Sequence, residues 1–331
     1  MMNCAVKRCV RASSFRVLRS NFTRIPIRQY AEVSNGLGID SNPVETNKKT
    51  ETNRLEKTLS KFWEKVAIRE TSDGFLIELD SKNIKTPLGN PLMIPKTKKT
   101  LAYLVETEWK NLQNLQIKPF VVPLTSVVSR AIDLESSDLA KDEEAIAKIG
   151  DLANIREMLL KYLDTDTLLV FSPVLEYEGT LRQAQEDMYR PIIKSMEEFF
   201  QPYAADGETV KLTYLDSDKH GLVGNLQTKA TRDAVRRWLE SLGTWDLVAL
   251  EKATLTAKSF LSGVLILRSQ DPNDKDRLSL EEIARAATLE TIYQTERWGE
   301  VEDTHDVDKV DIRRNLATCA LIAYDDKKFL K

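Results

Sequence analysis

The sequence predicts an α+β protein in which a small β-rich N-terminal domain precedes a larger, all-helical C-terminal domain. Short apolar segments that end at turn signals fill residues 62–95. After Pro123, apolar residues recur mostly at helical spacing until near the end of the chain. The length of 331 residues is sufficient for two such domains and a sizeable hydrophobic core.

The first 30 residues have the composition of a mitochondrial transit peptide. They contain seven basic residues and no acidic one, and they lack the long apolar centre of a secretory signal. Arg28 stands two residues before Tyr30, a context for matrix-protease cleavage, so the mature chain is predicted to begin at Tyr30 or Ala31. Residues 31–56 are predicted to be a flexible lead-in. The expected location is the mitochondrial matrix, with peripheral contact at the inner membrane left open; the alternative is a disordered basic tail that binds an acidic partner.

Charge and residue counts exclude several classes of function. Without the seven N-terminal charges, 41 basic and 51 acidic residues remain, a net charge of −10, which disfavours non-specific nucleic-acid binding. No apolar run approaches the roughly 18 residues of a transmembrane helix, so no integral membrane segment is predicted. The histidines His220 and His305 and the cysteines Cys4, Cys9 and Cys319 are too few and scattered for a Cys/His zinc site or a disulfide framework. The glycine motifs of nucleotide-binding loops are missing, so neither a nucleotide nor another cofactor is predicted.

The N-terminal domain, residues 57–123, is predicted to be a β-meander covered by one helix. Pro87 lacks a backbone N–H and therefore restricts the strand before it to an edge of the sheet. Helix 98–112 carries an apolar stripe that suits it to cover this sheet, which is too small to be stable alone. The predicted strands are Val66–Ile68, Phe75–Leu79, Ile84–Thr86 and Leu92–Ile94.

The C-terminal domain, residues 124–331, is predicted to be helical. Ser279 and Glu282 have the spacing of a capping box at the start of one helix. Val210–Leu215 is a candidate strand between two helices. The predicted helices cover residues 124–134, 138–163, 178–199, 226–241, 244–268, 279–298 and 306–324.

Two groups of acidic residues are candidates for catalysis or metal binding. The densest lies between Glu296 and Asp311, but it lacks a calcium-loop motif, so we favour a solvated acidic loop in which Asp306 caps the last helix. Asp164 and Asp166 follow a predicted helix; acid–base catalysis and a structural turn are the alternatives, and we favour the turn. A matrix enzyme that uses these carboxylates with a divalent cation is the main alternative to a binding protein.

Helix 279–298 carries apolar and acidic residues on both of its faces. Gln294 and Trp298 share one face, Glu290 lies at the edge of that face, and Glu296 lies on the opposite side. A carboxylate at an apolar edge is costly unless a donor meets it. That donor is either a salt-bridge partner inside the protein or a group on a binding partner, and periodicity alone favours the internal one.

Six separated motifs form one ordered pattern in this sequence. They are Phe62–Val66; Thr86–Leu92; Glu108–Trp109 with Ile117–Pro119 and Pro123–Thr125; Ala131–Asp133; Tyr162–Thr167; and Leu289–Glu290 with Tyr293–Gln294, Trp298–Gly299 and His305–Asp306. In this order and spacing, the chain resembles the assembly factor 2 family of mitochondrial ATP synthase, the chaperones of the F1 α subunit. The resemblance covers roughly residues 60–325, and although each motif is weak alone, the six together are specific.

The resemblance implies the same fold and a function that is not enzymatic. Members of this family bind newly imported, unassembled α subunit, whose exposed interface is prone to aggregation until β subunits displace the chaperone and cover it. It also implies that the important acid of helix 279–298 is Glu290, and it reverses the preference for an internal partner. We therefore predict a partner-binding surface made of Glu290, Gln294 and Trp298, with Glu296 ranked lower, and no catalytic residue, metal or cofactor.

Overall fold

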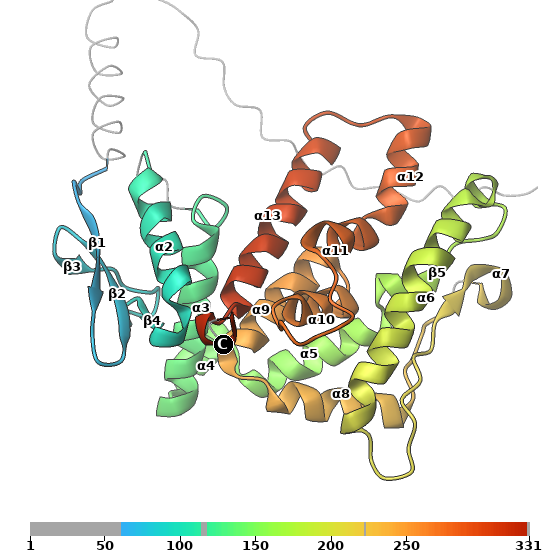
Figure 1. Cartoon of the computed structure of the whole chain (residues 1–331), viewed down its shortest axis with the longest axis horizontal. Helices are drawn as coiled ribbons and strands as arrows, with labels where there is room; N and C mark the ends of the chain where they lie inside the picture. The colour runs from blue at the N-terminus through green and yellow to red at the C-terminus, as the bar shows by residue number, and fades with distance from the viewer. Residues whose placement is uncertain (1–60, 114–117, 222, 330–331) are drawn as a thin grey trace, which may run out of the picture. The chain divides into compact units, whose positions relative to one another are not determined.

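A computed structural model describes residues 61–113, 118–221 and 223–329 (Figure 1). The predicted transit peptide, its cleavage at Tyr30 or Ala31 and the lead-in 31–56 lie outside these residues. Within them, a small N-terminal sheet is followed by a helical part, as the sequence predicts. One cluster of buried hydrophobic side chains extends from the sheet into the helices. None of the helices among the described residues is long and apolar enough to span a membrane.

The sheet is antiparallel, and its central strand is β2 (Gly74–Leu79). On one side β2 pairs with β1 (Val66–Glu70), in a register that places Val66 opposite Leu79. On the other side it pairs with β3 (Lys82–Asn83) near one end and with β4 (Met93–Pro95) near the other. The predicted meander is therefore confirmed at three of its four strands.

The predicted strand Ile84–Thr86 is wrong. In this segment Ile84 makes single backbone hydrogen bonds, its amide to the Ile77 carbonyl at 2.9 Å and its carbonyl from the Leu92 amide at 2.8 Å, and an isolated bridge joins Lys85 to Pro91. The chain turns instead between Thr86 and Asn90, where the Thr86 amide donates to the Asn90 carbonyl at 2.8 Å. Gly89 has a φ of 91° in this turn, in the left-handed region that glycine adopts without strain. Pro87, which has no backbone N–H to donate, directly follows Thr86 and prevents a longer hydrogen-bond ladder in this segment.

The predicted covering helix is present as α2 (Lys99–Asn111), which contacts β1, β2 and β4. Trp109 lies on its buried stripe, 5.4 Å from the ring of Trp63, and its indole nitrogen donates to the Thr125 hydroxyl at 2.9 Å. This bond joins α2 to the next helix, α3 (Pro123–Ala140), which is longer than the predicted 124–134.

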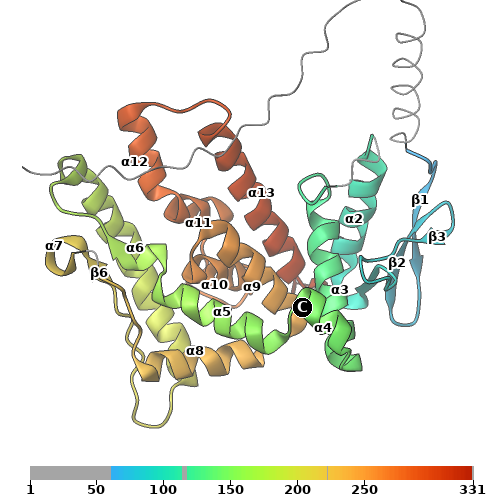
Figure 2. The ribbon, with the colours of Figure 1, turned by 180° about the vertical axis from the view of Figure 1, so that it is seen from behind.

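Helix α3 lies between α2 and the remaining helices, and polar contacts fix it on both sides (Figure 2). Toward the sheet, the buried carboxylate of Asp133 accepts from Thr86 and from the Asn90 amide at 2.7 Å. Toward the helices, Arg130 makes a bidentate ion pair with Glu251, with N–O distances of 2.6 and 2.7 Å. The arginine fork and the carboxylate match in geometry, which makes this pair orientation-specific.

The C-terminal end of the chain also fastens onto α2. The ammonium of Lys98, just before α2, is buried and donates to the carbonyls of Ile322 at 2.6 Å and Tyr324 at 3.0 Å. Asp326 accepts from the Thr100 amide in the first turn of α2. Burial lowers the pKa of Lys98. The two predicted parts therefore share an interface as well as a core.

Two helices predicted as continuous are each divided where the backbone turns left-handed. The predicted helix 138–163 breaks at Gly150, which has a φ of 83°, and its first three residues belong to α3, which ends at the left-handed Lys141. The predicted helix 244–268 breaks at Lys258, which has a φ of 53°, and Ser259 caps the helix that follows. Hydrophobic periodicity continues across both breaks, which is why the sequence did not reveal them. The resulting helices are α4 (Glu143–Ile149), α5 (Leu152–Asp164), α9 (Thr244–Ala257) and α10 (Phe260–Ser269).

The other predicted helices agree closely with the structure, apart from helix 279–298. They are α6 (Thr180–Phe200), α8 (Lys229–Ser241) and α13 (His305–Ala323). The predicted strand Val210–Leu215 is largely wrong, because only β6 (Leu215–Asp216) pairs, in parallel with β5 (Val170–Phe171). The amides of Val210, Leu212 and Thr213 instead donate to side chains, those of Gln201, Glu197 and Gln227.

Helices α9 and α10 form the centre of the helical part. Both are buried over most of their length, and α9 contacts α3, α10 and α13. Gly263 allows the close approach between them, since a Cβ placed on it would lie 2.6 Å from Thr254 Oγ1 and 2.9 Å from Leu250 Cδ1. The hydroxyls of Thr254 and Ser262 are buried here with no hydrogen-bond partner among the described residues.

We expect Gly263→Ala to lower the free energy of unfolding by about 1–3 kcal/mol, because overpacking outweighs the better helix propensity of alanine. Denaturant unfolding would measure the change. The neighbouring Ser262→Ala is the control: it removes a buried hydroxyl that lacks a partner, so we expect it to be neutral or slightly stabilising. Equal stability of Gly263→Ala and the wild type would show that the two helices have room to separate.

Candidate functional site

The predicted partner-binding residues all lie on α12 (Leu289–Trp298), a helix with little burial. Leu289 is its single buried residue, and among the described elements its main contact is with α6. It follows α11 (Leu280–Ala287), whose capping box between Ser279 and Glu282 is confirmed. In Figure 1, α12 stands at the edge of the helical part beside the end of α6.

The predicted single helix 279–298 is wrong, because Thr288 separates α11 from α12. The Thr288 hydroxyl donates to the Ala284 carbonyl at 2.8 Å and ends the first helix there. The single face predicted for the whole helix is therefore divided: Ala284 is buried, Gln294 is half-buried and Trp298 is 70% exposed. Periodicity alone does not register a break of this kind, because both helices keep their local spacing.

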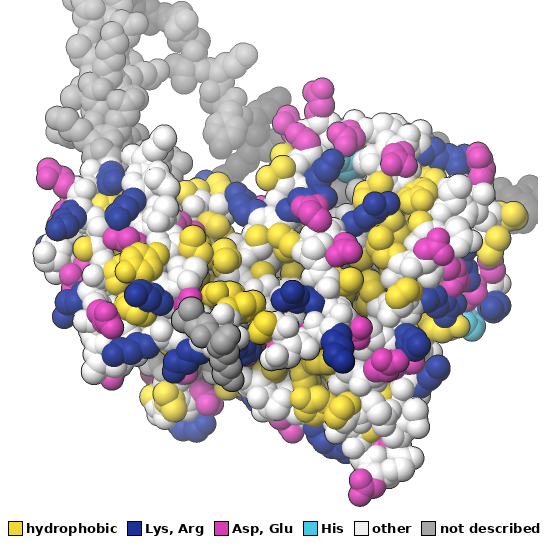
Figure 3. Space-filling view, in the orientation of Figure 1, with side chains coloured by type: hydrophobic (Ala, Val, Ile, Leu, Met, Phe, Trp, Pro, Cys, Tyr) yellow, Lys and Arg dark blue, Asp and Glu magenta, His cyan; other side chains and the backbone are white. Residues whose placement is uncertain are grey.

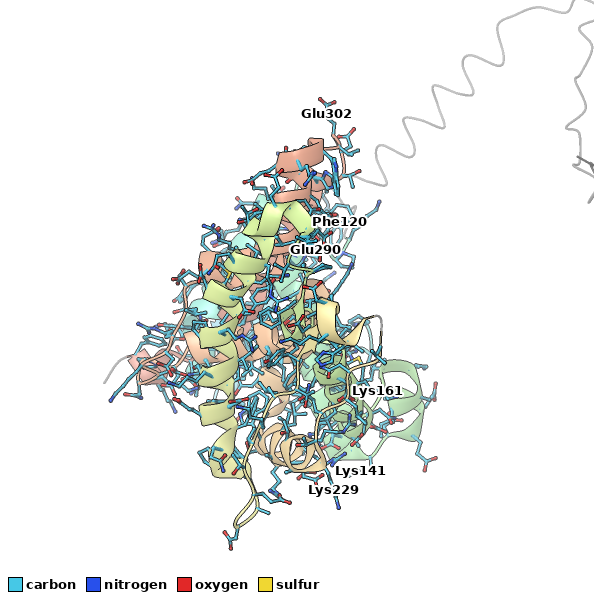
Figure 4. The ribbon with its side chains drawn as sticks, turned by 90° about the vertical axis from the view of Figure 1, so that its right-hand side faces the viewer. Phe120, Lys141, Lys161, Lys229, Glu290 and Glu302 are labelled. Carbon is cyan, nitrogen blue, oxygen red and sulfur yellow. The ribbon has the colours of Figure 1, made fainter. Side chains whose placement is uncertain are left out.

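Glu290 is exposed and lies in the first turn of α12. Its carboxylate accepts one bond, from the Gln294 amide at 2.9 Å, and no lysine or arginine among the described residues pairs with it. Figure 4 places Glu290 well away from the labelled lysines Lys141, Lys161 and Lys229. An internal salt bridge in the core, the interpretation that periodicity favoured, is therefore wrong for the described part of the chain.

A second element that the sequence did not single out lies against α12. It is the turn η3 (Glu176–Gly179), where Tyr177 packs edge-on against Tyr293, with ring centroids 6.1 Å apart, and against Trp298 at 5.6 Å. The guanidinium of Arg297 lies 5.6 Å from the same ring. Burial, followed by the nearby carboxylates Glu176 and Glu290, raises the pKa of the Tyr177 phenol. No local pattern connects this turn with a helix more than a hundred residues later, so the contact cannot be read from the sequence.

An open groove of about 1110 Å³ lies beneath α12. Glu290 and Glu296 both line it, although the sequence placed them on different sides of the helix. The predicted site residue Trp298 is not part of its lining. Apolar side chains such as Ile292 and Ile312 share the groove with basic ones, Lys258, Arg285 and Lys309. The groove therefore has a mixed chemical character that does not select one small ligand.

The acid pair Asp164 and Asp166 has a structural role, as we favoured. Asp166 is completely buried and accepts from the amides of Leu168 and Leu261 and from the Ser259 hydroxyl, which fastens the start of α10. Burial raises its pKa from 3.8 to about 6. Asp164 pairs with Arg232 and accepts from the Gln227 amide at 3.0 Å. Both carboxylates are therefore occupied by the fold.

The acidic stretch before α13 does not converge on a cation site. Among the described residues, no group of three or more His, Cys, Asp or Glu side chains is arranged to hold a metal ion. The expected capping role of Asp306 is wrong: α13 begins at His305 after Thr304, and no side chain caps its amides. Asp306 lies in the first turn, where its charge still favours the positive end of the helix dipole. His305 accepts from the Val301 amide at 2.9 Å through Nδ1.

Comparisons with known proteins agree on one family. Residues 60–197 match the family model described as ATP12 chaperone protein. The chain is 49% identical over 309 residues to the mitochondrial protein ATP12 of Saccharomyces cerevisiae, covering 90% of this chain and 93% of that protein. It is 34% identical over 268 residues to the mitochondrial atp12 of Schizosaccharomyces pombe, covering 81% and 83%. The crystal structure of Atp12 from Paracoccus denitrificans has the same fold, with a TM-score of 0.59 at 21% identity, covering 80% of this chain and 97% of that one.

The raised pKa of Asp166 predicts a pH-dependent stability. The pKa of Asp166 is 3.8 in the unfolded chain and about 6 in the folded protein, so the folded protein binds this proton more tightly. Protonation of Asp166 therefore stabilises the fold fully below pH 3.8, and this stabilisation is lost as pH rises through 6. We expect the wild type to gain about 2–3 kcal/mol relative to Asp166→Asn as pH falls from 7 to 4. Denaturant unfolding of both proteins measures this difference, and Glu240→Gln, an exposed carboxyl, is the control. If the difference in unfolding free energy between the wild type and Asp166→Asn stayed the same at all pH values, the pKa of Asp166 would not be raised in the folded protein.

Proposed function

The chain belongs to the ATP12 chaperone family and is thus an assembly chaperone of the mitochondrial ATP synthase, and we propose that its client is the unassembled α subunit of F1. The chaperone would act in the matrix, where it covers the α surface that later contacts β subunits. Exposed apolar interface of this kind leads to aggregation when it is left uncovered. Binding and release require no chemical step, and we assign no cofactor and no catalytic residue.

Glu290 is the observation that supports this proposal most directly. It combines an exposed carboxylate, one internal hydrogen bond from the Gln294 amide and a position on a helix with a single buried residue. A charge that the protein's own described residues leave unpaired is available to a cation on a partner. The four predicted residues Glu290, Gln294, Glu296 and Trp298 lie together on α12, and we propose this helix as the client-binding element.

Charge also supports association with a basic surface. From residue 31 onward the chain has a net charge of −10, which accelerates encounter with a positively charged client and weakens the encounter at high salt. An interface of about 1,600 Å² is usual for a specific complex and is larger than α12 alone provides. Neighbouring elements, such as the turn η3, must therefore contribute. Release follows when β subunits occupy the same α surface, because the two bindings are then mutually exclusive.

We expect Glu290→Lys to keep the fold and weaken capture of α at least tenfold, corresponding to about 1.4 kcal/mol or more, because the new charge repels the client's cation. Purified variant and unassembled α would be mixed, and binding and α aggregation measured by pulldown and light scattering. Circular dichroism and the melting temperature should stay near those of the wild type, since Glu290 is exposed.

Glu240→Lys is the matched control for this experiment. Glu240 is also an exposed glutamate on a helix, but it lies on α8 rather than α12. Glu240→Lys changes the net charge by the same amount as Glu290→Lys. A loss of α capture that is caused only by weaker long-range attraction would therefore appear in both variants. Normal capture of α by Glu290→Lys, or equal losses in the two variants, would show that α12 is not the client-binding element. A pulldown from the matrix of cells that lack β subunit tests the identity of the client. Recovery of other matrix proteins without α would show that α is not the client.

A further inference from the structure

Three exposed apolar residues lie around the buried ring of Tyr177: Val174 and Leu175 shortly before it in the chain, and Trp298 against it on α12. We call these four residues the aromatic patch. Leu175 is 90% exposed, Trp298 70% and Val174 52%, and the ring of Tyr177 lies beneath Trp298 at 5.6 Å. Figure 3 shows hydrophobic side chains gathered between α12 and α6, with charged side chains around them. Large apolar side chains that are exposed together, rather than singly, mark interaction sites.

The backbone beneath the aromatic patch is held in an unfavourable conformation. Tyr177 and Glu178 have φ values of 49° and 58°, so two successive non-glycine residues are left-handed before Gly179. The Asp218 carboxylate fixes the turn by accepting from the Val174 amide at 2.8 Å, and the Thr180 hydroxyl donates to the Tyr177 carbonyl at 2.6 Å. Strain of this kind persists where the surrounding structure over-determines it, and it clusters at functional sites. A fixed aromatic surface also loses little conformational entropy when a partner binds.

Charge determines which partner suits the aromatic patch. The acids Glu176, Glu178 and Glu290 belong to the same two elements as the patch, and all three are exposed. The segment that continues from α12, residues 290–311, contains eight acidic and two basic residues. Figure 3 shows acidic side chains, with a few basic ones among them, around the α12–α13 connection. A partner that covers the apolar centre must therefore present positive charge at its edges.

We propose that the aromatic patch binds a cationic amphipathic segment of the client. The apolar side of that segment lies on Trp298 and Leu175, and its lysines or arginines face Glu176, Glu178 and Glu290. An exposed tryptophan that is supported from below by another aromatic ring and surrounded by polar groups has the features of a binding hot spot. This inference rests on the proposed function, because it states the chemistry of the client segment that α12 recognises.

Trp298 provides a direct optical probe of the aromatic patch. The chain has five tryptophans, and the other four, Trp63, Trp109, Trp238 and Trp245, are at most 8% exposed. Emission at long wavelength and collisional quenching by acrylamide therefore report mainly on Trp298. A partner that covers the patch shifts this emission to shorter wavelength and reduces the quenching.

The probe is a synthetic Leu/Lys peptide of about 18 residues with helical apolar periodicity. With the full chain, we expect a shift of the emission to shorter wavelength, acrylamide quenching reduced at least about threefold, and binding that weakens as salt rises. A peptide of the same composition in scrambled order and a Leu/Glu peptide of the original pattern should leave the emission unchanged. If the scrambled peptide bound equally well, the binding would be non-specific charge attraction and the proposal would be overturned. The proposal would also be overturned if the Leu/Lys peptide changed neither the emission nor the quenching.

Variants locate the binding and separate this inference from the proposed function. Trp298→Ala and Leu175→Ser should each weaken binding of a labelled Leu/Lys peptide at least about tenfold. Leu139→Ser is the control, since Leu139 is 79% exposed and follows Asp138, but lies on α3. Equal losses in all three variants would place the peptide elsewhere. If the wild type captures α and Trp298→Ala captures it equally well, the inference fails alone; if the peptide binds at the aromatic patch but α is not captured, the proposed client fails instead.

Discussion

Burial of the α9–α10 pair is the constraint on which the arrangement of the helical part depends. Both helices are apolar on nearly all sides, so every side requires a cover. Helices α3 and α13 pack on α9, α5 contacts both helices of the pair, and α11 contacts α10. The sharp connection at Lys258 and Ser259 brings the two helices together, and the carboxylate of Asp166 fixes the start of α10 from an otherwise distant segment. Once this centre is enclosed, the positions of the surrounding helices are largely determined.

The N-terminal sheet is joined to this centre by polar contacts as well as by packing. The Arg130–Glu251 ion pair links α3 to α9, and Asp133 links α3 to the turn between β3 and β4. Lys98 and Thr100 bind Ile322 and Asp326 near the C-terminus. This C-terminal segment therefore belongs to the same interface as α3. Buried charges and amides require partners in a defined geometry, and they therefore orient the two parts more strictly than apolar packing does.

Helix α12 stands outside this network, and that position suits a binding element. Burying a helix removes most of its side chains from contact with partners, whereas α12 buries only Leu289 among its residues. It is positioned by aromatic contacts with Tyr177, which a strained turn holds in place. The helix is thus presented by a rigid support and keeps Glu290 and Trp298 exposed. A chaperone needs such a surface, because its client has to be bound firmly and then released to another partner.

The sequence by itself determined the order of the elements, the sheet followed by helices, the capping box at Ser279 and the acidic character of the chain after residue 30. These are local or additive properties, and spacing, turn residues and charge counts report them directly. Only the tertiary structure decided where the long helices break, because a left-handed residue such as Lys258 is selected by packing rather than by periodicity. It also decided that Glu290 is exposed and that Tyr177 supports α12. Contacts between segments so far apart in the chain arise from the burial of a shared core, and no local pattern encodes them.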